Sequence, residues 1–371
     1  MLVNGKHYRS IWVKDNDKRV IQTIDQSKLP HYFEIIDLKT TNNVIHAIKD
    51  MTLRGAPLIG VAASYGIYLA ALEAKSETND IQSYEIFVNT KANELKSTRP
   101  TAVNLLWGID QTLGAIAKYN TIDEKINASF NCANKLANDD IKSCRKIGGS
   151  GLKIIEDIKK SKSSDVVNIL THCNAGWLAC IDYGTATSPI YTAHEKGIKV
   201  HVWVEETRPR NQGASLTAWE FGQTGIPHTI ITDNAGGYVM QKDLVDLVIV
   251  GSDRTTCTGD VCNKIGTYKT ALAAKDNNIP FYAALPSSSI DWTLKDGLNE
   301  IPIEERDAEE VKFIQGKYKD EIVKVLLTPK NSPAKNFGFD ITPSSLVTGI
   351  ITERGICDAN EKSIRELFPE K

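Results

Sequence analysis

The sequence predicts an α/β protein in which a small antiparallel sheet and a helical bundle precede a Rossmann-like parallel sheet with helices on both faces. Short strand-like runs open the chain, and segments with helical spacing follow them. After about residue 150, apolar β-rich runs alternate with helical segments, which is typical of a parallel sheet covered by helices. We therefore expect an N-terminal mixed β/helical domain over residues 1–150 and a Rossmann-like domain over residues 151–371.

The N-terminal strands are predicted from three apolar runs in the first forty residues. Polar turns at residues 15–18 and 26–30 separate them, so we expect an antiparallel meander. The runs are residues 8–13, 20–24 and 32–37.

Helical spacing follows the meander, beginning after a helix cap expected at Thr41 or Asn42. The second of these segments is rich in small and apolar residues, as in a buried helix. We expect helices over residues 43–51, 57–72, 82–96, 103–119 and 122–138. The glycine-rich run at residues 148–151 interrupts this spacing and predicts a loop near the domain boundary.

The second half of the chain contains five short β-rich runs with helical segments between them. The predicted strands are residues 166–171, 199–204, 227–232, 244–250 and 280–284. The predicted helices are residues 181–196, 214–224 and 264–277. The region has no GxGxxG sequence, so we expect a Rossmann-like sheet without a nicotinamide cofactor.

Composition and charge exclude several classes of protein. The formal net charge of −2 gives no bulk electrostatic case for binding nucleic acid or an anionic membrane. The longest apolar stretches, such as residues 246–251, fall far short of the ~20 residues that span a membrane, and residues 1–15 lack the apolar run of a signal peptide. The seven cysteines include no CxxC pair, so a structural zinc site is not expected, and the expected compartment is the cytosol.

Polar and small residues follow every predicted strand of the parallel sheet. Ligands of open parallel sheets bind at the carboxyl ends of the strands. The strands are followed by residues 172–176, 205–213, 233–237, 251–254 and 286–289. Because these segments converge on one edge of the sheet, we expect the functional site there.

Cys173 and Asp253 are the strongest candidates for chemistry in these segments. Cys173 follows a strand and precedes a predicted helix, whose dipole would favour a thiolate; the alternative is a buried cysteine that fills space. Asp253 follows an apolar strand, where burial would raise its pKa toward the range useful for proton transfer. The alternatives for Asp253 are an ion pair with Arg254 or a helix cap. Strand alternation directs His172 away from Cys173, which favours a structural role.

Several residues could hold a phosphate group or a sugar. Arg54 opens an RGA sequence before a predicted helix, where small residues permit close backbone approach to an anion. Arg99 could grip phosphate with two N–H groups, although either arginine could instead be a surface or capping residue. Asn263 and Lys264 lie near a predicted helix start, and Gln212 could bind a sugar hydroxyl.

Seven stretches, in order along the chain, resemble the methylthioribose-1-phosphate isomerase family. That family shares a superfamily with the regulatory subunits of translation initiation factor 2B and with ribose-1,5-bisphosphate isomerases. The stretches are RGAPLIG (54–60), STRPTAVNL (97–105), LTHCNAG (170–176), ETRPRNQGASLTAWE (206–220), DNAGG (233–237), GSDRTTCTGDVCNKIGTY (251–268) and FDITPSSLVTGIITERG (339–355).

The resemblance implies an aldose–ketose isomerase that converts 5-methylthioribose 1-phosphate to 5-methylthioribulose 1-phosphate in methionine salvage. It implies Cys173 and Asp253 as the catalytic residues, a homodimer, and no metal or nucleotide cofactor. The substrate contacts that it implies are Arg54, Gly55, Ala56, Arg99, Gln212, Asn263 and Lys264.

The chain departs from the usual family pattern at five places. It has IGGSG for IGEHG (147–151), GSDR for GADR, GDVCNK for GDVANK, PSSSID for P-x-S-T-I-D (286–291) and NFGFD for NPAFD (336–340). These changes leave the 5-substituent of the sugar open, with 5-deoxyribose 1-phosphate as an alternative substrate. Two further alternatives are a non-catalytic regulatory subunit like those of factor 2B and a thiol enzyme built on Cys173, although the latter lacks a CxxC partner.

Overall fold

The N-terminal strands form the predicted antiparallel meander. The computed structural model describes residues 1–99 and 102–371, so Pro100 and Thr101 of the STRPTAVNL stretch lie outside the described residues. The sheet order is β3-β4-β5, with both pairs antiparallel. Its strands are β3 (Ile11–Val13), β4 (Ile21–Ile24) and β5 (Ile35–Leu38), and a short hairpin of β1 (Leu2–Val3) and β2 (Lys6–His7) precedes them.

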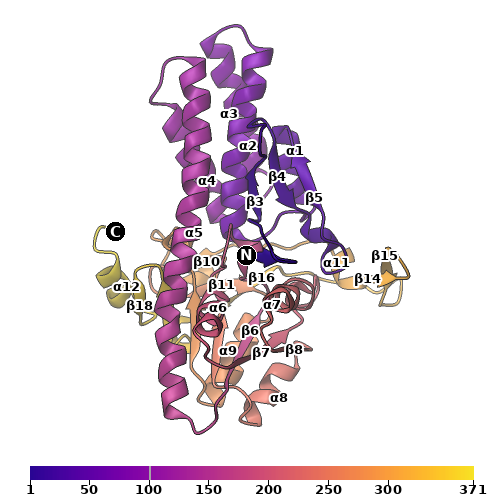
Figure 1. Cartoon of the computed structure of the whole chain (residues 1–371), viewed down its shortest axis with the longest axis vertical. Coiled ribbons are helices and arrows are strands. Elements are labelled where there is room, and N and C mark those ends of the chain that lie inside the picture. Colours follow the sequence, from indigo (N-terminus) through magenta and orange to yellow (C-terminus); the bar gives the residue numbers. More distant parts are fainter. Residues whose placement is uncertain (100–101) are drawn as a thin grey trace.

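Five helices follow, as predicted, and with the meander they form the upper part of the molecule in Figure 1. They are α1 (Thr41–Lys49), α2 (Ala56–Glu77), α3 (Ile81–Lys96), α4 (Val103–Ile116) and α5 (Ile122–Ser161). The cap of α1 is Thr40, one residue before the predicted position, because its side chain accepts the Asn43 N–H.

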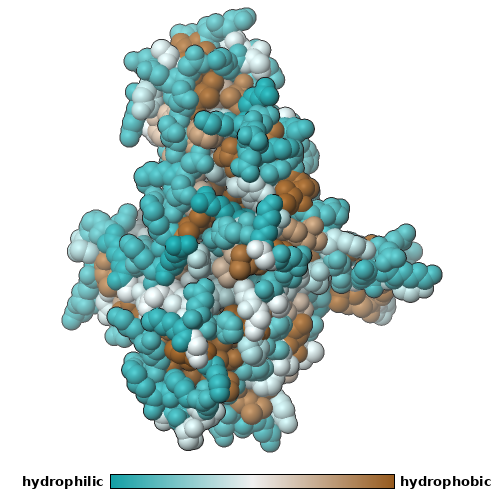
Figure 2. All heavy atoms as spheres, viewed as in Figure 1, coloured by the Kyte–Doolittle hydropathy of each residue, from teal (hydrophilic) through white to brown (hydrophobic). Residues whose placement is uncertain are grey.

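α2 is the buried helix that its composition predicts. By length and composition it could cross a membrane, but 83% of its most apolar stretch is buried inside the protein. Gly60 and Gly108 bring α2 and α4 into backbone contact, since a Cβ on Gly108 would lie 2.2 Å from the Gly60 carbonyl oxygen. The face drawn in Figure 2 is mainly hydrophilic over this part of the molecule.

The predicted loop at residues 148–151 is wrong, because α5 continues without a break to Ser161. The glycines instead allow α6 (Ser188–Glu195) to approach α5 closely. A Cβ on Gly148 would lie 2.5 Å from Ser188 Oγ, and one on Gly151 would lie 2.5 Å from Pro189 Cγ. The predicted domain boundary at residue 150 therefore falls within a helix, and the division of the chain into two domains stays a prediction.

The five predicted strands of the second half form five consecutive strands of one large sheet, from β12 to the edge strand β8. Its order is β18-β17-β12-β9-β6-β7-β8, and all neighbours are parallel except β17 and β18. The predicted strands are β6 (Val167–His172), β7 (Val200–Glu205), β8 (His228–Ile231), β9 (Leu247–Val250) and β12 (Phe281–Ala284). The sequence prediction missed β17 (Gly349–Thr352) and β18 (Gly355–Cys357).

Helices cover both faces of this sheet, as expected. Ile169 and Leu247 lie in one apolar core with residues of α5, α6 and α7 (Ala218–Thr224). The alternate residues Leu170 and Val248 lie in a second core on the other face. That core includes residues of α8 (Ala235–Gln241), α9 (Thr267–Asp276) and α12 (Glu361–Leu367).

A small mixed sheet lies beside the large one and was not predicted. Its order is β13-β10-β11-β16, from β10 (Arg254–Thr256), β11 (Val261–Lys264), β13 (Ile290–Asp291) and β16 (Phe339–Thr342). Asn263 and Lys264 therefore belong to a strand, and the helix predicted from residue 264 begins at Thr267. The hairpin of β14 (Phe313–Tyr318) and β15 (Glu321–Leu326) projects at the side of the molecule, next to the short α11 (Glu309–Lys312); α10 (Gly297–Glu300) precedes them (Figure 1).

Two glycines of α5 provide a matched test of the contact between α5 and α6. A Cβ on the exposed Gly149 would meet nothing within 4 Å, whereas one on the buried Gly151 would collide with Pro189. We expect Gly149→Ala to stabilise the protein by about 0.5–1 kcal/mol through helix propensity. Gly151→Ala should destabilise it by about 1–3 kcal/mol through overpacking, as measured by urea unfolding. Equal effects of the two substitutions would contradict the close packing of α5 on α6.

Candidate active site

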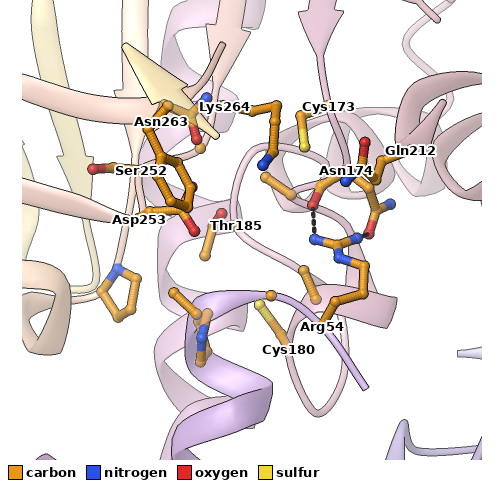
Figure 3. A pocket seen from close by; sticks show the side chains of 18 of the residues that line it. Arg54, Cys173, Asn174, Cys180, Thr185, Gln212, Ser252, Asp253, Asn263 and Lys264 are labelled. Carbon is orange, nitrogen blue, oxygen red and sulfur yellow. Dashed lines mark hydrogen bonds between the residues drawn. The ribbon is translucent and has the colours of Figure 1, made fainter. Parts of the chain in front are cut away.

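All nine residues predicted for the site line one pocket. They are Arg54, Gly55, Ala56, Arg99, Cys173, Gln212, Asp253, Asn263 and Lys264. The pocket lies where the start of α2 faces the carboxyl ends of β6 and β9 and the strand β11. Figure 3 shows Asp253 and Asn263 on one side, Cys173 and Arg54 on the other, and the Lys264 side chain between them.

Cys173 follows β6 in a backbone conformation that few non-glycine residues adopt, with φ of 66°. Two threonines hold it there. The Cys173 N–H donates to Thr207 Oγ1 at 2.8 Å, and the Thr217 hydroxyl donates to the Cys173 carbonyl at 2.7 Å. The helix predicted after Cys173 over residues 181–196 begins only at Ser188, as α6, and a loop with the 3₁₀ turn η2 (Trp177–Ala179) separates it from Cys173. No helix terminus next to Cys173 therefore favours a thiolate.

Glu220, which the sequence prediction did not select, stabilises the loop that follows Cys173 by accepting hydrogen bonds from it. Its side chain is 0% exposed. It accepts hydrogen bonds from the Trp177 and Leu178 N–H groups, from Asn174 Nδ2 and from the Tyr191 hydroxyl, at 2.8–3.1 Å. A buried carboxylate needs such a set of donors. Burial raises the pKa of Glu220, and these donors oppose that shift.

Arg54 contacts the same loop from the N-terminal part of the chain. Its guanidinium donates to Asn174 Oδ1 at 2.5 Å and to the Asn174 carbonyl at 2.7 Å, as Figure 3 shows. Both acceptors are neutral, and Arg54 forms no ion pair with a carboxylate among the described residues, although its charge acts on nearby Asp253. The next residue, Gly55, has φ of +99°, and a Cβ there would lie 2.5 Å from the Ala179 backbone.

The start of α2 offers donors to an anion in the pocket. Gly55 precedes the helix, and no side chain caps its first N–H groups. Ala56 and Pro57, the first residues of the helix, line the pocket. An uncapped helix N-terminus beside an arginine is suited to bind a phosphate group.

Arg99 differs from Arg54 in having an acidic partner. Its Nη2 lies 2.7 Å and its Nε 3.1 Å from Glu304 Oε2. Burial would raise the pKa of Glu304, but Arg99 and Arg306 outweigh burial and hold this pKa below its ordinary value. The charge of Arg99 is therefore shared with a carboxylate, which leaves Arg54 as the stronger attraction for an anion.

Asp253 does not form the ion pair with Arg254 that the sequence left open. Arg254 pairs with Asp291, with Nε at 3.0 Å from Oδ2. The Asp253 N–H donates to the Cys262 carbonyl at 2.9 Å, while its carboxylate has no hydrogen-bond partner within residues 1–99 and 102–371. Burial raises the pKa of Asp253, as predicted, although nearby Lys264 lowers it in part.

Cys173 and Lys264 complete a group whose protonation is interdependent. Burial raises the pKa of Cys173 above its ordinary value, although Arg54 and Lys264 oppose the shift, so burial disfavours the thiolate that a helix dipole would favour. Burial lowers the pKa of Lys264, although Cys173 and Asp253 oppose that shift. The Lys264 ammonium donates to the Gly338 carbonyl at 2.9 Å. A thiol, an acid and an amine with shifted pKa values in one pocket are suited to proton transfer.

The remaining predicted residues have distinct environments. Gln212 is 6% exposed, and its Oε1 has no partner among the described residues, so it is free to accept a hydrogen bond from a ligand. The Asn263 amide donates to Thr267 Oγ1 at 3.0 Å. His172 lies outside the pocket with both ring nitrogens engaged, as strand alternation predicts.

Two groups of side chains in the described part of the chain could in principle ligate a metal. They are Asp140, Cys144 and Cys180, and His172, Glu205 and Asp233. Neither group contains Cys173 or Asp253. Only Cys180 of these residues lines the pocket.

Comparisons with known proteins place the chain in a family. Residues 52–359 match the model of the initiation factor 2 subunit family. Methylthioribose-1-phosphate isomerases from Desulfatibacillum aliphaticivorans and Sinorhizobium medicae are 54% and 53% identical to it, each over 100% of both chains.

Two solved structures are similar over nearly the full length. The 5-methylthioribose 1-phosphate isomerase of Pyrococcus horikoshii is 36% identical with a TM-score of 0.84, and covers 99% of this chain and 97% of its own. Translation initiation factor eIF-2B subunit delta from A. fulgidus is 39% identical with a TM-score of 0.80, and covers 98% of this chain and 100% of its own. The chain therefore belongs to the initiation factor 2 subunit family and, within it, to the methylthioribose-1-phosphate isomerases.

Proposed function

We propose that this chain is an aldose–ketose isomerase that converts 5-methylthioribose 1-phosphate to 5-methylthioribulose 1-phosphate. The observation that supports this most strongly is the pocket in which Cys173, Asp253 and all seven proposed substrate contacts lie together. Relatives named methylthioribose-1-phosphate isomerase that match along the whole chain support the same activity.

The pocket has one region suited to the phosphate group. The uncompensated charge of Arg54, the uncapped start of α2 and the Lys264 ammonium are cationic or donor groups, whereas the charge of Arg99 is shared with Glu304. We assign the phosphate to the region of Arg54 and the residues Gly55 and Ala56. Gln212 Oε1 and the Asn263 side chain are then available to the sugar.

The reaction requires an acid, because the anomeric oxygen carries phosphate and the ring of such a sugar does not open spontaneously. Asp253 is the donor that we assign to the ring oxygen, since its raised pKa retains a proton at higher pH than an exposed aspartate would. Hydrogen must then move from C2 to C1. Removal of the C2 proton requires the thiolate of Cys173, which burial disfavours and the charges of Arg54 and Lys264 favour. In a direct hydride shift, Cys173 instead stabilises the transition state. Both an enolate route and a direct hydride shift are compatible with this pair.

The walls of the pocket reduce the access of water to the reacting atoms. Apolar or small side chains of Met51, Pro57, Ala179, Pro286 and Phe339 line it. Exclusion of water strengthens the electrostatic interactions inside and protects a reactive intermediate. The raised pKa values of Cys173 and Asp253 have the same cause, since the protein shields both groups from water, Cys173 almost fully and Asp253 in part.

We further propose that the enzyme works as a cytoplasmic homodimer in methionine salvage. The proposed chemistry uses no metal and no cofactor, since proton transfer by side chains suffices. Nothing in the net charge of −2 favours nucleic acid as a partner. Within residues 1–99 and 102–371, the one helix that is long and apolar enough to span a membrane is packed in the core.

A non-catalytic regulatory subunit is the second candidate function. The likeness to eIF-2B subunit delta from A. fulgidus is the observation that favours it. A scaffold has no need for a buried thiol, acid and lysine around an uncompensated arginine, and we therefore prefer the isomerase.

The proposed function is tested by an isomerase assay with 5-methylthioribose 1-phosphate and 5-deoxyribose 1-phosphate side by side. We expect turnover of the methylthio substrate, with the ketose 1-phosphate identified by NMR. Turnover of the deoxy substrate alone would contradict the methylthio group that we assign to C5 and would make 5-deoxyribose 1-phosphate the substrate. Inactivity on both would refute the isomerase and favour the regulatory subunit.

Substitutions at the two catalytic residues provide a second test. We expect Asp253→Asn and Cys173→Ala each to lower kcat by about 10²-fold or more, since each removes a group that acts on the reacting atoms. Cys180→Ala is the matched control, because it removes another buried thiol from the same pocket wall. Circular dichroism checks that the variants are folded. A near-normal rate in either catalytic variant would exclude that residue from the mechanism.

A further inference from the structure

His172 lies behind the pocket with both of its ring nitrogens against hydrogen-bond acceptors. The side chain is 0% exposed. Its Nδ1 lies 2.7 Å from Glu205 Oε2, and its Nε2 lies 2.8 Å from the Ile265 carbonyl oxygen. A carbonyl cannot donate, and Glu205 is itself surrounded by donors, since Thr270 Oγ1 lies 2.9 Å from Oε2 and Lys269 Nζ 3.4 Å from Oε1. Nε2 must therefore carry a proton, and Nδ1 carries one as well when Glu205 is ionised, a state that the neighbouring Lys269 ammonium favours.

The two contacts of His172 connect the two sides of the catalytic pocket. Cys173 is the next residue after His172, and Ile265 is the next residue after Lys264. His172 and Ile265 are 93 positions apart in the sequence, so the bond between them links β6 directly to the end of β11. The ring therefore joins the backbone next to the Cys173 thiol to the backbone next to the Lys264 ammonium.

We propose that His172 is a positioning residue whose doubly protonated ring holds Cys173 and Lys264 at the spacing that isomerisation requires. A neutral ring carries one proton, so beside an ionised Glu205 one of its nitrogens would face an acceptor without a hydrogen between them. The contact with Glu205 or with Ile265 would then be lost. Because His172 contacts no substrate, it acts only through its neighbours.

The ring packs closely against the backbone at Gly266. Gly266 has φ of +104°, and a Cβ there would lie 2.9 Å from His172 Cε1. The glycine therefore lets the imidazole lie against the backbone that follows Lys264. Because of this packing, we expect the position of residues 265–266 to depend on the position and charge of the ring.

Charged groups from four elements face His172. They are Glu205 of β7, Asp233 after β8 at 4.0 Å, Lys269 of α9 and Asp340 of β16. Burial alone would lower the pKa of His172, but the hydrogen bond and charge of Glu205, with the smaller effect of Asp233, outweigh burial and raise it. The protonated ring is present below this raised pKa and is lost as pH rises through it.

The charge of the ring is tested by NMR of the full-length protein labelled with ¹⁵N-histidine, with His172→Gln used to assign the signals. We expect both ring nitrogens of His172 to carry protons near neutral pH, at about 7, where an ordinary histidine is mostly neutral. We also expect Glu205→Gln to lower the pKa of His172, and this variant serves as the test if His172→Gln does not fold. A ring nitrogen without a proton at neutral pH would overturn the proposal.

The positioning role rests on the proposed function and is tested by the kinetics of His172→Gln. We expect kcat to fall by about 10-fold or more and KM to rise, because both Cys173 and Lys264 shift. The alkaline decrease of kcat/KM in the unmodified enzyme should follow the pKa that NMR gives for His172. His201→Gln is the control and should behave like the unmodified enzyme, since His201 lies on β7 outside the pocket.

The outcomes separate the two hypotheses. Unchanged kcat and KM in folded His172→Gln, with only a lower Tm, would overturn the positioning role and reduce His172 to a structural residue. A protein that is inactive on every sugar phosphate but contains doubly protonated His172 would refute the proposed function while supporting the charge that we assign to the ring.

Discussion

Glu220 accepts four hydrogen bonds in a position that no solvent reaches, and the loop that contains Cys173 is built around it. Leaving one buried hydrogen-bonding group without its partner typically costs about 1–3 kcal/mol, so this arrangement strongly constrains the loop. The loop packs so closely on Glu220 that a Cβ on Gly176 would lie 1.8 Å from Glu220 Oε2. Through Asn174, the same carboxylate orients the Arg54 guanidinium.

The loop fixed by Glu220 explains how two distant parts of the chain form one pocket. The large sheet brings Cys173 and Asp253 to neighbouring strand ends, as expected for a parallel sheet. Arg54 and Arg99 then reach across from the N-terminal part to Asn174 and Glu304. The neutral partner leaves the charge of Arg54 available to an anion, whereas Arg99 is engaged with a carboxylate. Two arginines that look equivalent in the sequence therefore have different electrostatic roles.

Most of the fold could be predicted because its main elements have clear periodicity and length. The central strands and the first five helices are of this kind. The small sheet was missed because its strands are two to four residues long and pair over long sequence distances, as β11 does with β16. The glycines at 148–151 were predicted to form a loop but lie within α5, because glycine permits a close helix contact as readily as a turn.

In the candidate site, too, local features could be predicted from the sequence and tertiary features could not. Its residues could be located from strand ends and motifs, since these depend on local sequence. The state of Cys173 could not, because the absence of a following helix and the degree of burial are tertiary properties. Glu220 was missed for a related reason: a lone acid in a largely apolar segment does not reveal the four donors that surround it.

The central claim is that the sugar lies between Cys173 and Asp253 with its phosphate at Arg54 and the start of α2. A crystal structure of the Asp253→Asn enzyme with bound 5-methylthioribose 1-phosphate tests it most directly. We expect C1 and C2 of the sugar to contact Cys173 Sγ, with the side chain at position 253 facing the ring oxygen and the phosphate beside Arg54. A sugar bound away from Cys173, for example in the neighbouring cleft lined by Leu216, Phe313 and Lys324, would contradict the account.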